Sequence, residues 1–293
     1  MRPHRSAKRS SARRSDASAY RGVFINLARS TRRRATLVRH LKEIGVVSRY
    51  ERFEAVDGRA VAARFPTELD PGNLGIWLTH EALLRTHRSL GLDLHLHILE
   101  DDTVLAKRAR QKFEQVLSQA DALSSWDLLF TDIFVPLSVQ TFRVFVENID
   151  RHAQSGRHAL VDLASIGFAS CCSMFVNKRS VAKYARLIRG NWALGMPLDL
   201  FIRQLVHQGA LRAYVTVPFL TSIADSVQSD VRGRTDRSRQ VCDVLRRGLF
   251  EEADHPALLA RMRALTKGAR LSDRAALFVK AESFSLSDQW TPF

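Results

Sequence analysis

Short apolar runs alternate with longer amphipathic segments along most of this 293-residue chain. The apolar runs have the length and residue types of buried strands, and they lie at residues 22–27, 50–56, 92–99, 126–130, 169–176 and 213–220. Helical spacing of apolar residues occupies 31–44, 74–90, 104–123, 137–153, 180–188 and 198–207. Strands that alternate with helices predict an α/β fold with a mostly parallel central sheet.

The composition is that of a soluble globular protein. Hydrophobic residues make up 45% of the chain and charged residues 26%. The longest stretch without a charged side chain, residues 163–177, is shorter than the roughly 20 residues of a membrane-spanning helix. We therefore expect a cytoplasmic protein without a transmembrane segment. The three cysteines include no C-x-x-C pair, which argues against a disulfide framework.

The chain carries a net charge of +15 at pH 7. This excess predicts an anionic partner: a nucleic acid, an acidic membrane surface or a phosphorylated substrate. Residues 1–20 hold six basic residues and one acid and are expected to form a basic disordered tail. Residues 21–231 are expected to form the folded domain, and residues 232–293 a basic helical extension packed on it.

Three consecutive acids, Glu100, Asp101 and Asp102, directly follow the apolar run at 92–99. In extended geometry Glu100 and Asp102 point to one side and Asp101 to the other. A divalent cation would relieve the repulsion between the carboxylates, and their hard oxygens suit Mg²⁺ or Mn²⁺. The alternative is a solvated turn or the start of a helix, where acids are also favoured.

A second group of polar residues surrounds the end of the first strand. Asn26 and Leu27 end that strand, and Arg29 and Arg33 lie four residues apart where a helix is expected to begin. Free N–H groups at a helix start attract phosphate, and arginine adds bidentate contacts. The alternative is a solvated basic surface.

Other strand ends and helix starts carry further candidates. Ligands of α/β sheets bind at the carboxyl ends of the strands, so Asp57, Gly58 and Asp132 are candidates by position. Asp199 lies at a predicted helix start and is either a helix cap or a catalytic carboxylate. His80 is either a helix-face residue or a pocket residue.

Several motifs, in order along residues 20–231, resemble glycosyltransferase family 25, the lipooligosaccharide galactosyltransferases and their collagen-glycosylating relatives. They are Phe24-Ile-Asn-Leu27 with Arg29-Ser30 and Arg33, then Glu51 to Arg59, Leu74-Gly75 with Thr79-His80, His97 to Asp102, Pro197-Leu198-Asp199, and Pro218 to Val231. The chain departs from the family pattern at Ala28, Ile76 and Thr79, where that family commonly has Asp, Cys and Ser.

The resemblance implies a GT-A-like fold, a UDP-sugar donor, usually UDP-galactose, a divalent metal such as manganese, and transfer with inversion to a glycan acceptor such as lipooligosaccharide. It implies that Asp102 and Glu100 hold the metal and that Asp101 helps to hold the donor diphosphate. The other implied donor-binding residues are Asn26, Leu27, Arg29, Arg33, Asp57, Gly58 and His80. An inverting transfer also needs a general base, for which Asp199 is the first candidate and Asp132 the second.

Two other functions remain open from the sequence. The first is a protein that binds nucleic acid or an anionic surface, which the charge favours. Against it, residues 1–20 contain one aromatic residue, Tyr20, so platforms for base stacking are scarce there. The second is a degenerate transferase fold that binds a sugar nucleotide without turnover. As an enzyme, the protein is also expected to make peripheral contact with the anionic inner face of a membrane.

Overall fold

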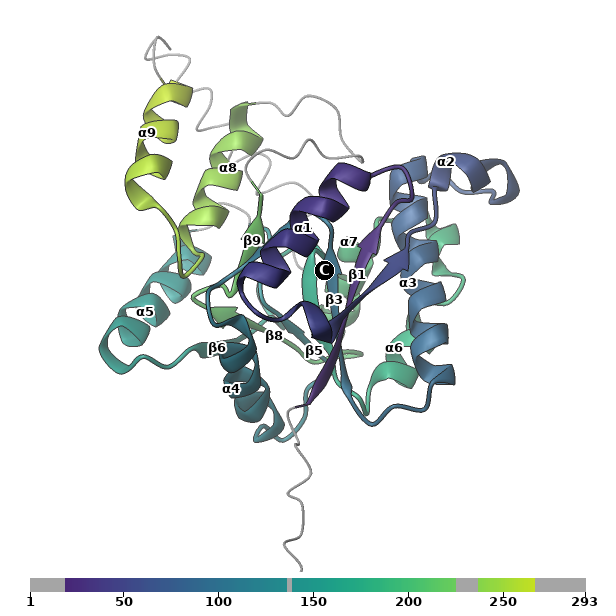
Figure 1. Ribbon diagram of the computed structural model, residues 1–293, viewed down its shortest axis with the longest axis horizontal. Helices are drawn as coiled ribbons and strands as arrows, with labels where there is room; N and C mark the ends of the chain where they lie inside the picture. The colour runs from purple at the N-terminus through teal and green to yellow at the C-terminus, as the bar shows by residue number, and fades with distance from the viewer. Residues whose placement is uncertain (1–18, 136–138, 225–236, 267–293) are drawn as a thin grey trace, which may run out of the picture.

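A computed structural model describes residues 19–135, 139–224 and 237–266 (Figure 1). Within these ranges seven strands form one sheet in the order β2–β1–β3–β7–β5–β8–β6. The strands are β1 (Tyr20–Asn26), β2 (Tyr50–Glu54), β3 (His95–Glu100), β5 (Leu128–Phe130), β6 (Ala159–Asp162), β7 (Ser173–Val176) and β8 (Ala213–Val217). Within this sheet of described strands, β6 and β7 run opposite to the other five. This confirms the α/β fold with a mostly parallel sheet and is consistent with a GT-A-like architecture.

Helices cover both faces of the sheet (Figure 1). Helices α1 (Thr31–Glu43) and α4 (Ala109–Asp121) pack on one face. Helices α3 (Pro71–Ser89), α6 (Val181–Ile188) and α7 (Leu198–His207) pack on the other. The remaining described elements are α2 (Gly58–Val61), α5 (Val139–Ser155), α8 (Arg237–Gly248), α9 (His255–Thr266), the 3-10 turns Val47–Arg49, Ala62–Arg64 and Asn191–Leu194, and the paired strands β4 (Thr103–Leu105) and β9 (Thr221–Ile223).

The core has a layer on each side of the sheet. Trp77 of α3 and Ile98 of β3 belong to one layer, and both are fully buried. Phe113 of α4 and Leu99 of β3 belong to the other. Ile98 and Leu99 are neighbours on one strand, so β3 contributes to both layers. A strand that is buried on both faces has a continuous run of apolar residues, and this run is the pattern that predicted β3 from the sequence.

Several elements differ from the sequence-based prediction, and three of them bear on the fold. Helix α3 begins at Pro71 rather than residue 74, because the Asp70 side chain accepts a hydrogen bond from Asn73 N (3.1 Å) and proline is favoured at the first helical position. The start of the predicted helix 104–123 instead forms strand β4, which pairs with β9. In this pairing Thr103 lies opposite Ile223, 120 residues later in the chain, a contact that local sequence does not reveal. The short edge strand β6 was not predicted.

The ends of the folded domain also differ from the prediction. Tyr20 was assigned to the tail, but it opens β1 and is 3% exposed in the core. The remainder of the predicted tail, residues 1–18, lies outside the described residues. In the predicted C-terminal extension, α8 and α9 are described. Backbone hydrogen bonds join Phe219 N to Leu249 O (2.8 Å) and Glu251 N to Phe219 O (3.0 Å), which connects the residues after α8 to the domain.

The described helices include none that is both long enough and apolar enough to cross a membrane. The three cysteines are free and buried, as a chain without a disulfide framework requires. His97, on β3, is also a core residue: its ring stacks on Phe175 at 3.8 Å, and its two nitrogens contact Tyr50 Oη and Ser173 Oγ.

Candidate active site

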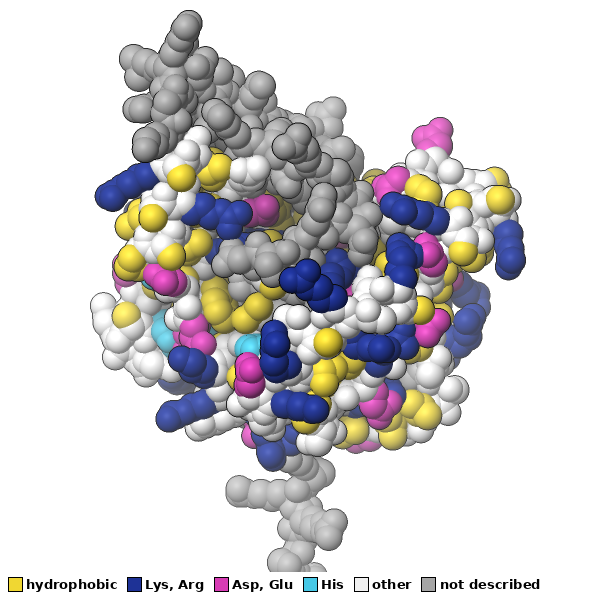
Figure 2. All heavy atoms as spheres, turned by 45° about the horizontal axis from the view of Figure 1, so that its top comes forward, with side chains coloured by type: hydrophobic (Ala, Val, Ile, Leu, Met, Phe, Trp, Pro, Cys, Tyr) yellow, Lys and Arg dark blue, Asp and Glu magenta, His cyan; other side chains and the backbone are white. Residues whose placement is uncertain are grey.

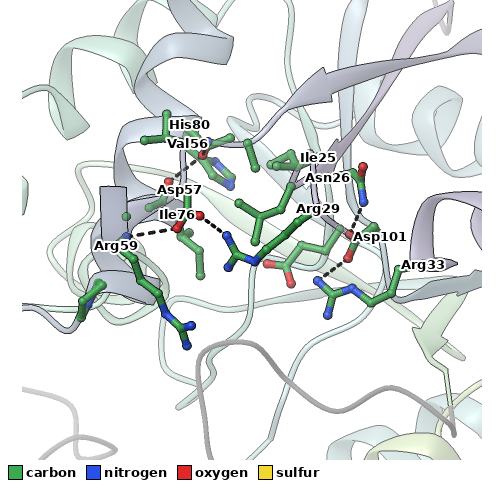
Figure 3. A pocket seen from close by; sticks show the side chains of 18 of the residues that line it. Ile25, Asn26, Arg29, Arg33, Val56, Asp57, Arg59, Ile76, His80 and Asp101 are labelled. Carbon is green, nitrogen blue, oxygen red and sulfur yellow. Dashed lines mark hydrogen bonds and ion pairs between the residues drawn. The ribbon is translucent and has the colours of Figure 1, made fainter. Parts of the chain in front are cut away.

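One pocket lies at the carboxyl ends of the neighbouring strands β2, β1 and β3 (Figure 3). Its empty volume is about 790 Å³, counting the part that is open to solvent. The pocket is lined by Ile25, Asn26, Leu27, Arg29, Arg33, Ala55, Val56, Asp57, Gly58, Arg59, Pro71, Gly72, Gly75, Ile76, Thr79, His80, Glu100, Asp101 and Asp102.

The acidic turn at the end of β3 is fixed by its backbone. Glu100 N donates to Cys172 O (2.8 Å), and the Thr103 hydroxyl donates to the same carbonyl (3.0 Å). On the other side, Ala224 N donates to Asp102 O (2.8 Å). Strand β7 and the end of β9 therefore hold the turn in place, so its carboxylates do not depend on a flexible loop.

Asp101 is the most enclosed of the three acids, with 6% of its surface exposed. Asn26 Nδ2 donates to its Oδ2 at 2.6 Å, and Arg33 Nη2 contacts its Oδ1 at 2.7 Å. Burial raises the pKa of Asp101, although Asn26 and Arg33 act in the opposite direction. Arg33 therefore fixes Asp101, and Asp101 joins β3 to the start of α1.

Glu100 is half-buried beside its two acidic neighbours. Burial first, and then the Asp102 and Asp101 carboxylates, raise its pKa to about 8. Such crowding of carboxylates is what a divalent cation relieves, and carboxylate oxygens are the ligands that Mg²⁺ and Mn²⁺ prefer. The residues present therefore fit a divalent cation held by Glu100 and Asp102.

Arg29 extends across the pocket toward Asp57, with which it forms an ion pair (Figure 3). Asp57 also caps α2, because its Oδ1 accepts a hydrogen bond from Arg59 N (3.1 Å). The side chains of Arg29 and Asp57 are 45% and 37% exposed. Solvent weakens such a pair, so Arg29 can exchange Asp57 for a phosphate at small cost.

Gly58 and Gly75 allow the two walls of the pocket to approach closely. A Cβ on Gly58 would lie 1.6 Å from Pro71 O, and a Cβ on Gly75 would lie 2.7 Å from Val56 O. The backbone after β2 therefore packs directly against the first turns of α3. Thr79 strengthens this junction, since its hydroxyl accepts a hydrogen bond from Val56 N at 2.9 Å and donates to Gly75 O at 2.6 Å.

His80 is fully buried, and it lines the pocket. Neither of its ring nitrogens has a hydrogen-bond partner among the described residues. Burial lowers the pKa of His80 to about 4, so the imidazole is neutral at pH 7 and offers one donor and one acceptor. In Figure 3, His80 and Asp101 lie on opposite sides of Arg29. The pocket thus has a charged part and a more apolar part with one unsatisfied imidazole.

Asp132 lies outside the residues that line this pocket. It is fully buried, and Arg246 of α8 donates to both of its oxygens, from Nε at 2.8 Å and from Nη2 at 2.6 Å. Burial raises the pKa of Asp132, while Arg246 acts in the opposite direction. With both oxygens engaged by Arg246, Asp132 is less accessible to a substrate than Asp199 is.

Asp199 also lies outside the pocket lining, in the first turn of α7, where it is half-buried. Its side chain does not cap the helix; it accepts hydrogen bonds from Ser170 N (2.9 Å) and Leu200 N (3.0 Å). Its charge contributes to the raised pKa of Glu100, so the two carboxylates are close enough to interact.

The pocket brings together every predicted donor-binding and metal-binding residue, whereas Asp199 and Asp132 lie beside it. Sequence reasoning missed Arg246, which connects this region to α8, and Ser170, which has a left-handed backbone (φ 90°) and bonds Asp199. It also missed Arg52, which donates to Asn26 Oδ1 (3.0 Å). No spacing or motif distinguishes these three residues from the many other polar residues of the chain.

Comparisons with known proteins identify no matching family model and no matching curated protein. Among solved structures, the chain is similar to mouse xyloside xylosyltransferase 1 in its apo form, with a TM-score of 0.38 and 14% sequence identity. The match covers 68% of this chain and 72% of that one. Similarity at this level does not establish a shared activity, so a function has to be argued from the pocket itself.

Proposed function

We propose that this chain is a metal-dependent inverting glycosyltransferase. It moves a hexose, with galactose as the expected sugar, from a UDP-sugar to a glycan acceptor such as lipooligosaccharide. The observation that carries this proposal is the composition of one pocket, in which three consecutive acids, three arginines and an unsatisfied buried imidazole meet at the carboxyl edge of an α/β sheet. The order of the motifs that resemble glycosyltransferase family 25 supports the same function.

The two parts of the pocket match the two parts of a nucleoside diphosphate. Ile25, Val56 and Ile76 supply apolar surface near His80, and a planar base fits such surface while its polar edge satisfies the imidazole. Asn26, Leu27, Asp57 and Gly58 lie along the path to the acidic turn. Glu100 and Asp102 would hold a cation, Mn²⁺ or Mg²⁺, which when bound neutralises charge on the departing diphosphate.

The chain's own residues prepare the donor for this departure. Arg29 lies over the pocket and is the residue best able to contact a phosphate directly, since its present partner Asp57 is partly solvated. Arg33 and Asn26 hold Asp101, and through it the acidic turn. Groups that are already fixed where charge develops lower the barrier without further reorganisation.

Asp199 is the proposed general base. As the acceptor hydroxyl oxygen forms its bond to the anomeric carbon, Asp199 takes the hydroxyl proton and the bond from that carbon to the diphosphate oxygen breaks with its electron pair on UDP. Attack from the face opposite the diphosphate inverts the anomeric centre. Asp132 is a positioning residue in this scheme, because Arg246 occupies both of its oxygens.

The direct test is release of UDP from a panel of UDP-sugars, with and without Mn²⁺. Replacing Asp102 by asparagine removes one negative charge from the cation site, and cation affinity depends on that charge. We expect Asp102→Asn to raise the Mn²⁺ concentration for half-maximal UDP release about 100-fold, equivalent to about 2.7 kcal/mol.

Asp93→Asn is the matched control. Asp93 precedes β3, at the end of this strand that is opposite to the acidic turn, and its exposed side chain pairs with Lys178. The Mn²⁺ concentration for half-maximal UDP release by Asp93→Asn should therefore stay within about twofold of the wild-type value. A panel in which no UDP-sugar binds or turns over would contradict the proposed function. Binding of UDP without transfer to any acceptor would instead identify a degenerate transferase.

The raised pKa of Glu100 predicts how cation binding depends on pH. Without a cation, Glu100 binds a proton below about pH 8, and the cation has to displace that proton. Apparent Mn²⁺ affinity should therefore rise with pH by up to about tenfold per unit below pH 8 and level off above it. Mn²⁺ titrations at pH 6.5, 7.5 and 8.5 measure this slope. Glu100→Gln, which cannot release the proton, should bind more weakly with a flatter slope.

The distribution of basic side chains favours a small anionic substrate over a nucleic acid. In Figure 2, lysine and arginine are spread over the visible face with aspartate and glutamate among them, and they form no continuous basic stripe on the described part of that face. A stripe of that kind is the usual footprint of nucleic-acid binding. The exposed Arg29, Arg32 and Arg59 lie near the pocket, where they suit a nucleotide sugar and contact with an anionic glycolipid or membrane surface.

A further inference from the structure

Two histidines and one glutamate meet far from the pocket, on the other side of the described chain. They are His152 in the last turn of α5, His158 just before β6, and Glu251 just after α8. His158 Nε2 lies 3.3 Å from Glu251 Oε2, and His152 Nε2 lies 3.7 Å from Glu251 Oε1. The potential ligand atoms of all three residues lie within 4.8 Å of one another.

We propose that His152, His158 and Glu251 form a zinc-binding site that fastens the segment after α8 to the connection between α5 and β6. Zinc takes imidazole nitrogens and carboxylate oxygens at about 2.0–2.2 Å, which separates tetrahedral ligands by about 3.4 Å. Each imidazole lies near that separation from one oxygen of the Glu251 carboxylate, His158 at 3.3 Å from Oε2 and His152 at 3.7 Å from Oε1. The two imidazole rings are 4.5 Å apart between centroids, so a modest side-chain movement completes the set. Water would take the fourth position.

The backbone at each ligand is already held in place. Gly156 N donates to His152 O (2.7 Å), which closes the end of α5. Glu251 N donates to Phe219 O (3.0 Å). The side chains of His158, His152 and Glu251 are only 4%, 17% and 19% exposed. A nearly formed and shielded site loses little conformational entropy when it binds a metal.

Lys112 is the competitor for this site. Its Nζ lies 2.8 Å from Glu251 Oε2 and 3.7 Å from Glu252 Oε1. Zinc binding requires the ammonium group to move from Glu251 to Glu252, which lies within reach. This competition makes Lys112 a diagnostic residue, because removing its charge should favour a metal at the triad and weaken a purely ionic cluster.

The experiment is a Zn²⁺ titration of the chelator-treated full-length protein against a chromophoric chelator, in millimolar Mg²⁺. Magnesium competes for the carboxylate-rich pocket but hardly for imidazole. We expect one Zn²⁺ to bind with a Kd below about 1 μM. His152→Gln and His158→Gln should each weaken binding at least tenfold, and Lys112→Met should strengthen it. His207→Gln is the matched control, since His207 lies on α7, contacts Ile166 O and is outside the triad.

Two further readouts separate a metal site from a structural role. Co²⁺ bound at the triad should give the intense visible absorbance of a tetrahedral site without a thiolate charge-transfer band, and His152→Gln should lose it. Urea midpoints without zinc identify any variant that is simply unfolded. Equal Zn²⁺ affinity in wild type and His152→Gln, or weaker affinity in Lys112→Met, overturns the proposal. None of these measurements depends on glycosyl transfer.

Discussion

Replacing Arg246 by methionine should destabilise the folded protein by about 3–5 kcal/mol. Arg246 contributes two short hydrogen bonds to Asp132, and the side chains of the pair are 8% and 0% exposed. Methionine fills much of the same volume but leaves the Asp132 carboxyl without its charged partner in the interior. Removing one member of a buried ion pair costs far more than the pair contributes, because the remaining charge is uncompensated. Urea denaturation followed by circular dichroism measures the loss.

A double-mutant cycle tests this cause. Asp132→Asn combined with Arg246→Met removes both charges, so the double variant should be more stable than Arg246→Met alone. Arg143→Met on α5 is the control, because its ion pair with Glu147 is exposed and should contribute no more than about 0.5 kcal/mol. A loss in Arg246→Met as small as that of Arg143→Met would show that the buried pair is not what holds α8 to the domain.

The same variant should also impair transfer. Arg246 Nη2 contacts Ser170 Oγ at 3.0 Å, and Ser170 N donates to Asp199. The arginine therefore positions the proposed base through the unusual backbone of Ser170. Arg246→Lys keeps the positive charge but loses the bidentate geometry. Relative to Arg246→Met, it should therefore restore more of the folding stability than of the transfer rate.

That these residues line one pocket was predictable, because it follows from the arrangement of a parallel sheet. Each strand end carries its own polar signal, as in Asn26 at the end of β1 and Glu100 at the end of β3, and parallel strands bring their carboxyl ends to one edge. The sequence does not show which strands are neighbours. The direct pairing of β1 with both β2 and β3 is what places Asp57 and Asp101 on either side of Arg29.

The features that were not predictable depend on contacts between distant residues. Asp132 and Arg246 are 114 positions apart, and in the sequence Arg246 is one of two adjacent arginines on an amphipathic basic helix. Strands β4 and β6 are too short to be recognised by periodicity, and each exists through pairing with a strand far along the chain. Net charge alone could not locate the site, because it does not show that Arg33 and Arg246 form internal ion pairs with Asp101 and Asp132.

Replacing Asp199 by asparagine should lower kcat for transfer by about 10²–10⁴-fold, the usual contribution of a positioned general base. Asparagine keeps the size of the side chain but cannot take a proton from the acceptor hydroxyl. Asp199 does not line the donor pocket, so the Kd for UDP with Mn²⁺ should change by less than about threefold, or about 0.6 kcal/mol. Steady-state transfer rates and calorimetric UDP binding measure the two quantities separately.

A structural role for Asp199 predicts a different pattern. Asparagine can accept a hydrogen bond from Ser170 N or Leu200 N through one oxygen only, so losing the other bond should cost about 0.5–1.5 kcal/mol of stability. That cost would lower the urea midpoint and leave kcat near the wild-type value. If Asp199 is the base, kcat falls by far more than the loss of this one hydrogen bond explains.

Asp162→Asn provides the matched control for the base. Asp162 ends the edge strand β6, where it accepts a hydrogen bond from Ala164 N (2.8 Å), so its replacement costs a similar local bond without touching the site. It should leave kcat unchanged. If Asp199→Asn keeps wild-type kcat, or loses UDP affinity in proportion to kcat, the base lies elsewhere. Asp132 would be tested next, as the double variant Asp132→Asn with Arg246→Met, because that combination removes its carboxylate without leaving an unpaired arginine in the interior.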